Sequence, residues 1–192
     1  MPKPNVREEL LTAGLSTLHQ RGFNATSVQD ITEAAGVPKG SFYNHFDSKE
    51  VLGAEVVLKY RQAAEARLAA LRDPRLEPLV RLRKYFEGLV RTLVEANFSC
   101  GCLLGNFGME LSAQSPLIRE QVATGLAVWC DEVALVIGEA QRAGTVPKEF
   151  GAKTLAKFIV NAWQGAVLRA KVDQDRVPLD LFVKLTFSKI LA

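Results

Sequence analysis

Apolar residues recur at spacings of three and four along almost the whole chain, with glycine or proline interrupting them at intervals. The first such segment sets Leu11, Leu15 and Leu18 on one helical face. No segment shows the alternating pattern typical of a half-buried strand. We therefore predict an all-α protein of about nine helices. The predicted helices span residues 6–20, 27–35, 38–46, 48–71, 79–96, 102–111, 117–143, 152–172 and 179–191.

Helix starts are predicted from capping-box spacings, in which a short polar residue precedes Glu or Gln by three positions. Thr26 with Gln29 predicts the start of the second helix, and Asp47 with Glu50 predicts the start of the fourth. Gly22 suits the position just after a helix end.

The stretch from Phe23 to Phe46 has the parts of a helix-turn-helix motif. A capped helix is followed by a turn at Gly36 and by a second, shorter helix that buries Phe42 and Phe46. A helix this short buries little surface and needs a partner to be stable. Its other faces carry groups able to hydrogen-bond with phosphates and bases. These groups belong to Lys39, Ser41, Tyr43, Asn44 and His45.

This stretch resembles the signature of the TetR family of transcriptional regulators. The resemblance covers residues 6–52 and rests on the helix that starts at Thr26, on the turn Ala35-Gly36-Val37 and on the segment 39–46. Thr32 departs from the pattern, since the family usually has alanine there. The resemblance implies a DNA-binding domain at 1–48 and a helical ligand-binding and dimerisation domain at 49–192.

The resemblance also implies roles in binding double-stranded DNA. Lys39, Ser41 and Asn44 are expected at base edges, and five further residues at the sugar-phosphate backbone. Those five are Thr26, Ser27, Tyr43, His45 and Lys49. A homodimer formed through the last two helices would bind a near-palindromic operator and respond to a small-molecule effector.

Charge gives this interpretation little support. The net charge of the 192 residues is +3, but residues 1–50 carry five basic and six acidic side chains. The motif therefore carries the prediction of DNA binding, not the charge. The chain starts Met1-Pro2-Lys3-Pro4, without the apolar core of a signal peptide, and no apolar run reaches the length of a membrane span. We expect a cytoplasmic protein that does not bind membranes and whose three cysteines are reduced.

Two local features bear on what the second domain senses. Cys102 lies in Ser99-Cys100-Gly101-Cys102-Leu103 at a predicted helix start, where the positive helix end favours a thiolate. Lys171 follows a largely apolar stretch. Together they resemble the N-ethylmaleimide-responsive branch of the family, which implies that Cys102 reacts with electrophiles or oxidants and that Lys171 partners it. The alternative is a reversible apolar-ligand pocket with inert cysteines. Its candidate lining residues are Phe98, Phe107 and Trp163.

Other classes of function find less support. Cys100, Cys102 and Cys130 could form a thiolate metal site, but their spacing matches no zinc motif. Both histidines, His19 and His45, lie in the N-terminal part, and the chain lacks a glycine-rich phosphate loop and a Gly-x-Ser-x-Gly motif. We therefore expect no enzyme, no metal and no cofactor. A purely architectural protein would not need the polar set on the short helix.

Overall fold

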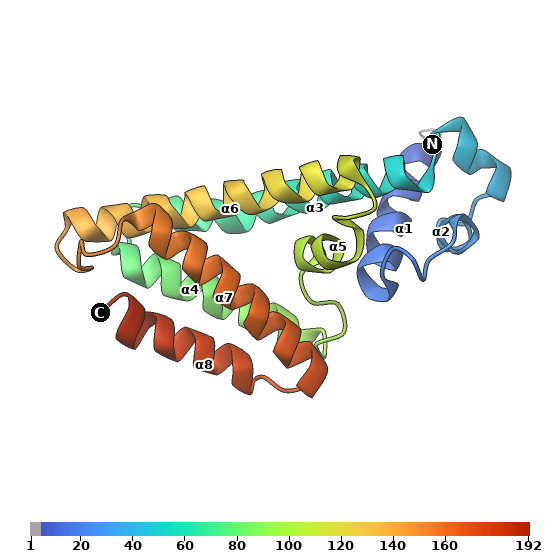
Figure 1. Ribbon diagram of the computed structural model, residues 1–192. Helices are drawn as coiled ribbons and strands as arrows, with labels where there is room; N and C mark the ends of the chain where they lie inside the picture. The colour runs from blue at the N-terminus through green and yellow to red at the C-terminus, as the bar shows by residue number, and fades with distance from the viewer. Residues whose placement is uncertain (1–4) are drawn as a thin grey trace. The chain divides into compact units, whose positions relative to one another are not determined.

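The computed structural model describes residues 5–192, and this part of the chain is helical without a strand (Figure 1). The expectation about the first four residues lies outside it. The predicted all-α fold is confirmed, because eight α-helices and one 3-10 helix occupy the nine expected positions. They are α1 Val6–Arg21, α2 Val28–Ala34, the 3-10 helix η1 Lys39–Asn44, α3 Lys49–Ala69, α4 Pro78–Glu95, α5 Leu103–Leu111, α6 Pro116–Arg142, α7 Ala152–Asp173 and α8 Val177–Leu185. The short segments η2 Ala70–Arg72 and η3 Thr186–Ile190 follow α3 and α8, and η3 has π-helical geometry.

The helix starts correct two predicted caps. Ser27, not Thr26, caps α2, and its box partner is Asp30 rather than Gln29. The helix begins one residue later than predicted, so the cap is also one residue later. Because the partner in a capping box comes three residues after the cap, the partner shifts by one residue as well. Before α3, the Ser48 hydroxyl accepts a hydrogen bond from the Val51 N–H at 3.1 Å, the role expected of Asp47.

The chain forms two compact units. Unit 1 comprises the chain up to Ala63 together with Cys102–Gly125, and unit 2 comprises Ala64–Gly101 together with Leu126–Ala192. Two long helices, α3 and α6, therefore contribute to both units. These units follow packing and do not coincide with the predicted functional domains 1–48 and 49–192.

Unit 1 is held by close packing between α1 and α3. A Cβ atom on Gly14 would lie 2.9 Å from a methyl group of Leu52, so a larger residue at this position would require the Leu52 side chain to shift. Leu52 is fully buried, as are Leu10 and Leu18 of α1. Arg7 and Glu55 add an ion pair between the same two helices at 2.5 Å. The packing gives the shorter helices α2 and η1 a platform.

Unit 2 has an aromatic core at the junction of α4, α7 and α8, and α7 and α8 lie side by side in Figure 1. The ring centroids of Phe86, Trp163 and Phe182 lie 5.0–5.4 Å from one another. Trp163 and Phe86 are almost completely buried. α6 is the one helix among residues 5–192 that is long and apolar enough to cross a membrane, and 44% of its most apolar window is buried.

Candidate functional site

The 3-10 helix η1 presents polar groups on one side and anchors itself by aromatic rings on the other. Phe42 is 0% exposed and Phe46, just after the helix, is 2% exposed, whereas Tyr43 between them is 59% exposed. Lys39 and Asn44 are exposed as well. His45 is also exposed and Ser41 is half-buried, so the five predicted contact residues of this segment come together on one short element.

The start of α2 separates the two residues that were predicted to contact phosphate. Ser27 is exposed, and its backbone N–H and hydroxyl both donate to the Asp30 carboxylate, at 2.7 and 2.5 Å. These bonds lower the pKa of Asp30. Thr26 is 1% exposed, and its hydroxyl donates to the Gly22 carbonyl at 2.7 Å. The buried hydroxyl of Thr26 is therefore already paired within unit 1, and its predicted phosphate contact stays a prediction.

Lys49 points into unit 1 rather than outward. Its ammonium donates to the backbone carbonyls of Phe23 and Thr26, at 3.0 and 2.8 Å, and lies 4.2 Å from the centre of the Phe23 ring. Burial lowers the pKa of Lys49, and the charges of Glu110 and Asp30 oppose this effect. The ammonium already has three partners in unit 1, and its predicted contact with the DNA backbone stays a prediction.

Glu110 of α5 is a residue that the sequence did not single out. Its carboxylate accepts hydrogen bonds from the backbone N–H groups of Phe23 and Asn24, at 2.9 and 2.5 Å. One turn earlier on α5, Phe107 packs edge-on against the Phe23 ring at 5.9 Å. α5 thus holds the segment that leads into α2. The available sequence signal was a single acidic residue in an otherwise apolar helix.

Cys102 lies at the N-cap of α5, at the other end of that helix from Glu110. Its side chain is 9% exposed, and the Tyr60 hydroxyl lies 4.0 Å from Sγ. The Tyr60 ring packs edge-on against His19 of α1 at 5.4 Å. Neither Tyr60 nor His19 was a predicted site residue, because periodicity does not reveal contacts between α1, α3 and α5.

The remaining predicted sensing residues are divided between the two units. Phe107 and Trp163 are fully buried parts of the aromatic packing in unit 1 and unit 2, respectively. Phe98 is half-buried and lies in unit 2, with left-handed backbone at φ 55°. Lys171 is also half-buried in unit 2, in the last turn of α7.

The other two cysteines differ from Cys102 in their surroundings. Cys100 and Cys130 are half-buried residues of unit 2. Burial raises the pKa of the Cys130 thiol, with a further contribution from Asp131 that Lys157 opposes. Within residues 5–192, no group of three or more His, Cys, Asp or Glu side chains is arranged to hold a metal ion.

Two family descriptions match this chain. Residues 10–56 match "Bacterial regulatory proteins, tetR family", and residues 78–186 match "Tetracyclin repressor-like, C-terminal domain". The HTH-type transcriptional repressor DhaR of Mycobacterium sp. (strain GP1) is 37% identical, with 100% of this chain and 95% of DhaR covered. The repressor NemR of Escherichia coli K12 is 27% identical, with 92% and 89% covered.

Solved structures agree with these matches. The crystal structure of regulatory protein TetR from Rhodobacter sphaeroides has a TM-score of 0.90 at 33% identity, covering 96% of this chain and 98% of that one. The reduced form of E. coli NemR has a TM-score of 0.85 at 25% identity, covering 98% and 97%.

An all-α chain with an N-terminal helix-turn-helix and these relatives is a regulator rather than an enzyme. It belongs to the TetR family of transcriptional regulators and is a DNA-binding transcriptional repressor. Regulators of this family bind DNA operators and ligands and function as dimers.

Proposed function

We propose that η1 enters the major groove of a near-palindromic operator in the cytoplasm. Lys39, Ser41 and Asn44 would contact base edges, while Ser27, Tyr43 and His45 would contact the sugar-phosphate backbone. The observation that carries this proposal is the exposed polar face of η1 on the buried rings of Phe42 and Phe46.

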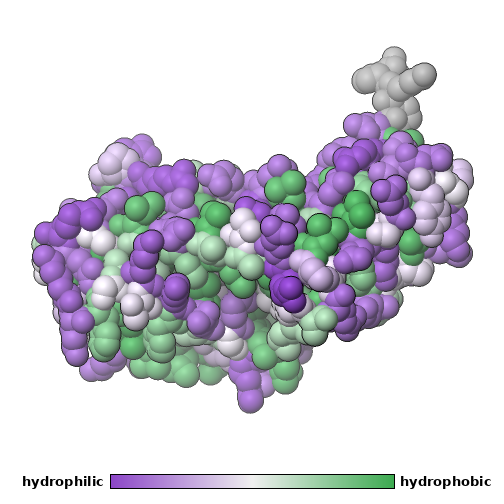
Figure 2. All heavy atoms as spheres, turned by 45° about the horizontal axis from the view of Figure 1, so that its top comes forward, coloured by the Kyte–Doolittle hydropathy of each residue, from purple (hydrophilic) through white to green (hydrophobic). Residues whose placement is uncertain are grey.

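The proposed operator symmetry depends on a homodimer formed through α7 and α8. Each of these helices exposes large apolar side chains along one face, and apolar residues reach the surface among polar ones in Figure 2. We define the α7 stripe as Phe158, Leu168 and Val172. The α8 stripe is Val177, Leu181 and Leu185. Pairing these stripes with those of a second copy would bury them in a four-helix bundle.

Two variants of η1 test the proposed DNA contacts. The duplexes are an operator recovered by selection from a random pool and a scrambled version of it, both at fixed salt. Tyr43→Phe should weaken binding to both duplexes about equally, because it removes a phosphate contact. Asn44→Ala should weaken binding to the operator by about 1–3 kcal/mol more than to the scrambled duplex, because it removes a base contact. Unchanged operator affinity in both variants would contradict the proposed role of η1.

For release from DNA, we propose that Cys102 reacts with electrophiles such as enals or quinones. The thiol gives up its proton, and the sulfur then bonds to the β-carbon of the enal. The electron pair of the carbon–carbon double bond moves to the α-carbon, which takes a proton from water. Cys102 is the N-cap residue of α5, so an adduct would form at the very start of that helix. The resemblance of residues 99–103 to the electrophile-responsive branch supports the same assignment.

Helix α5 provides a route from Cys102 to the DNA-binding motif. An adduct at the N-cap adds bulk where the side chain is almost fully buried, so α5 must shift to accommodate it. Glu110, in the last turn of the same helix, would carry that shift to Phe23 and Asn24 and so to the start of α2. Modification must shift the free-energy difference between the two conformations by about 5.5 kcal/mol, if the ratio of non-binding to binding conformation is to change from 1:99 to 99:1.

The alternative function is a repressor whose reversible apolar effector needs no reactive thiol. The two mechanisms separate when single cysteine variants are bound to operator and treated with acrolein or benzoquinone. We expect Cys102→Ser to abolish release, while Cys100→Ser and Cys130→Ser are released like the unmodified sequence. If Cys102→Ser leaves the operator at the same dose, the electrophile mechanism is wrong and the reversible alternative holds. A separate variant, Lys171→Met, tests the lysine that is predicted to partner Cys102. It should fold normally but leave the operator more slowly than the unmodified sequence at the same dose of electrophile.

A further inference from the structure

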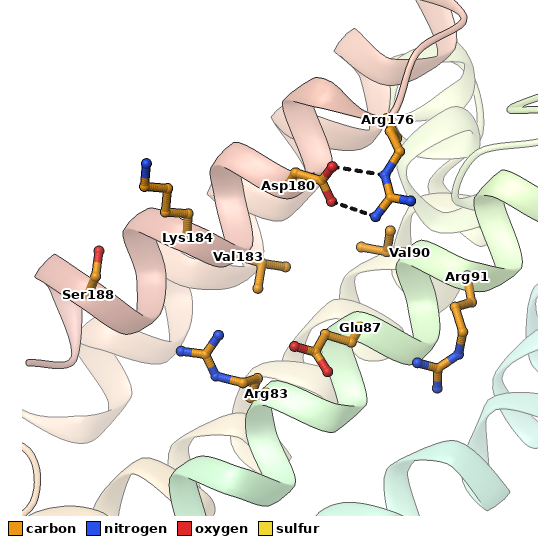
Figure 3. A pocket seen from close by; sticks show the side chains of 9 residues that line it. All are labelled: Arg83, Glu87, Val90, Arg91, Arg176, Asp180, Val183, Lys184 and Ser188. Carbon is orange, nitrogen blue, oxygen red and sulfur yellow. Dashed lines mark hydrogen bonds and ion pairs between the residues drawn. The ribbon is translucent and has the colours of Figure 1, made fainter.

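A charged groove lies between α4 and α8 within unit 2, and the proposed function does not use it (Figure 3). Its volume of about 480 Å³ falls in the range of small-molecule sites, about 300–1,000 Å³. Val90 and Val183 give it an apolar strip. Its polar lining residues are Arg83, Glu87, Arg91, Arg176, Asp180, Lys184 and Ser188.

The charges of this groove follow a regular order. On α4, the charged residues are spaced four positions apart in the order cation, anion, cation: Arg83, Glu87 and Arg91. The charged residues of α8 and its N-cap have the same spacing and order: Arg176, Asp180 and Lys184. Figure 3 shows Arg83 and Lys184 at one end of the groove and Arg91 and Arg176 at the other, with the two carboxylates between them. Each end thus carries one cation from each helix, and the side chains of Lys184 and Arg91, which point away from the opposite helix, would turn toward a bound anion.

Two of the arginines are held in place by neighbours. Arg176 donates two hydrogen bonds to the Asp180 carboxylate, at 2.8 and 2.9 Å. The guanidinium of Arg83 lies 4.5 Å from the centre of the Phe187 ring. Stacking on a ring face leaves the N–H groups in the guanidinium plane able to donate to a ligand. Orienting these groups in advance lowers the entropy cost of binding.

Arg91, Lys184 and Glu87 have no ion pair in the part of the chain described, residues 5–192. They are the charges for which a ligand would supply the partner. Ser188, in the π-helical segment η3, adds a hydroxyl at the Lys184 end of the groove. Single π-helical turns occur frequently at functional sites.

We propose that this groove binds an elongated anion with a phosphate group at each end and hydroxyl groups between them, such as a sugar bisphosphate. Arg83 and Arg91 are eight residues apart on α4, which corresponds to about 12 Å along the helix. A phosphate at each end would meet one cation from each helix. Hydroxyl groups on the ligand, between its two phosphates, would donate to the Glu87 carboxylate. A ligand without such hydroxyl groups would leave this carboxylate without a hydrogen-bond donor.

The groove stays open in the proposed homodimer. The α8 stripe that we assign to the dimer follows the charged residues by one position, since Leu181 comes after Asp180 and Leu185 after Lys184. One residue turns an α-helix by about 100°, so the stripe and the charged residues face different ways. The two surfaces can therefore be occupied at the same time.

Titration calorimetry of the full-length protein at low salt tests the proposal with three probes. These are fructose 1,6-bisphosphate, fructose 6-phosphate and inorganic phosphate. We expect the bisphosphate to bind at least about tenfold more tightly than either probe with a single phosphate group, because only it reaches both ends. Arg91→Ala and Lys184→Ala should each weaken bisphosphate binding by about tenfold and leave it close to that of fructose 6-phosphate.

Lys153→Ala is the matched control, since Lys153 is an exposed lysine of α7 outside the groove. It should leave bisphosphate binding unchanged. The proposal is overturned if the bisphosphate gives no binding heat at millimolar concentration, or if inorganic phosphate binds as tightly. It is equally overturned if the control loses as much affinity as the two groove variants.

Discussion

Unit 1 and unit 2 expose different kinds of side chain. Of the fourteen large apolar side chains that are exposed among residues 5–192, ten belong to unit 2. The exposed part of unit 1 that matters for DNA is instead the polar face of η1, supported from below by two buried rings. The difference matches two kinds of partner: polar groups suit phosphates and base edges, while apolar groups suit burial against a second copy of the chain.

The largest expected effect comes from removing the support of the polar face. Phe42→Ala should lower the free energy of unfolding by about 3–5 kcal/mol, because it deletes a fully buried ring and leaves a cavity. Urea denaturation measures the change. Phe158→Ala in the α7 stripe is the comparison from unit 2, where the ring is 55% exposed. It should change the free energy of unfolding of the isolated protomer little. An equal loss of stability in the two variants would contradict the difference between a buried ring in unit 1 and an exposed ring in unit 2.

A smaller but clear effect is expected from placing a charge in the α8 stripe. Leu181→Glu should give a monomer, because burying a carboxylate without a partner is unfavourable. Operator affinity should then fall by about 100-fold, since one recognition helix is left per complex. Sedimentation and mobility-shift assays measure the two changes. Val80→Glu, on an exposed position of α4, should leave both unchanged. A dimeric Leu181→Glu protein would show that the stripe does not form the interface.

The cap of α2 should contribute least. Ser27→Ala should lower the free energy of unfolding by about 1 kcal/mol, as expected for an N-cap. Its partner Asp30 adds a pH dependence. The folded-state pKa of Asp30 lies below the ordinary value of 3.8, so its contribution is present above that pH and is lost as the pH falls through the folded-state value. Acid unfolding followed by circular dichroism should show a smaller loss below pH 3.8 for Asp30→Asn than for the unmodified sequence.

A further comparison concerns two thiols. Because burial raises the pKa of Cys130 above its ordinary 9.0, little of it is thiolate at neutral pH. A variant that retains only Cys130 should therefore react slowly with iodoacetamide at pH 7 and speed up only as the pH rises beyond 9. The proposed sensing role requires a variant that retains only Cys102 to react faster at pH 7, although Cys102 is the more buried of the two thiols. The reverse order would remove the reason for assigning the sensing role to Cys102.

The sequence predicted the helices well because their apolar spacing and their Gly and Pro boundaries are local properties. It predicted less well which polar residues face outward. Thr26 and Lys49 lie in the same motif as Lys39, yet they turn inward and bond to backbone carbonyls of unit 1. Local spacing alone does not show this, because Lys49 is 26 residues away from Phe23 in the chain.

Contacts between distant segments account for the other gaps. Glu110 bonds to backbone groups 86 and 87 residues earlier, and Tyr60 approaches Cys102 across 42 residues. Periodicity identified α5 as a helix but not the elements that its two ends would meet. Phe107 and Trp163 are candidates for lining a pocket, and both are buried against other aromatic rings that the helical spacing alone did not identify.

The most direct test of the account compares the two lysines of the motif, one facing outward and one facing inward. Operator affinity and urea denaturation are measured for Lys39→Ala and Lys49→Met. We expect Lys39→Ala to weaken operator binding by about 1–3 kcal/mol with no change in the free energy of unfolding. Lys49→Met should lower the free energy of unfolding by about 1–3 kcal/mol, because the hydrogen bonds from the ammonium to the Phe23 and Thr26 carbonyls are lost. Full operator affinity in Lys39→Ala would contradict the assignment of η1 as the element that reads DNA.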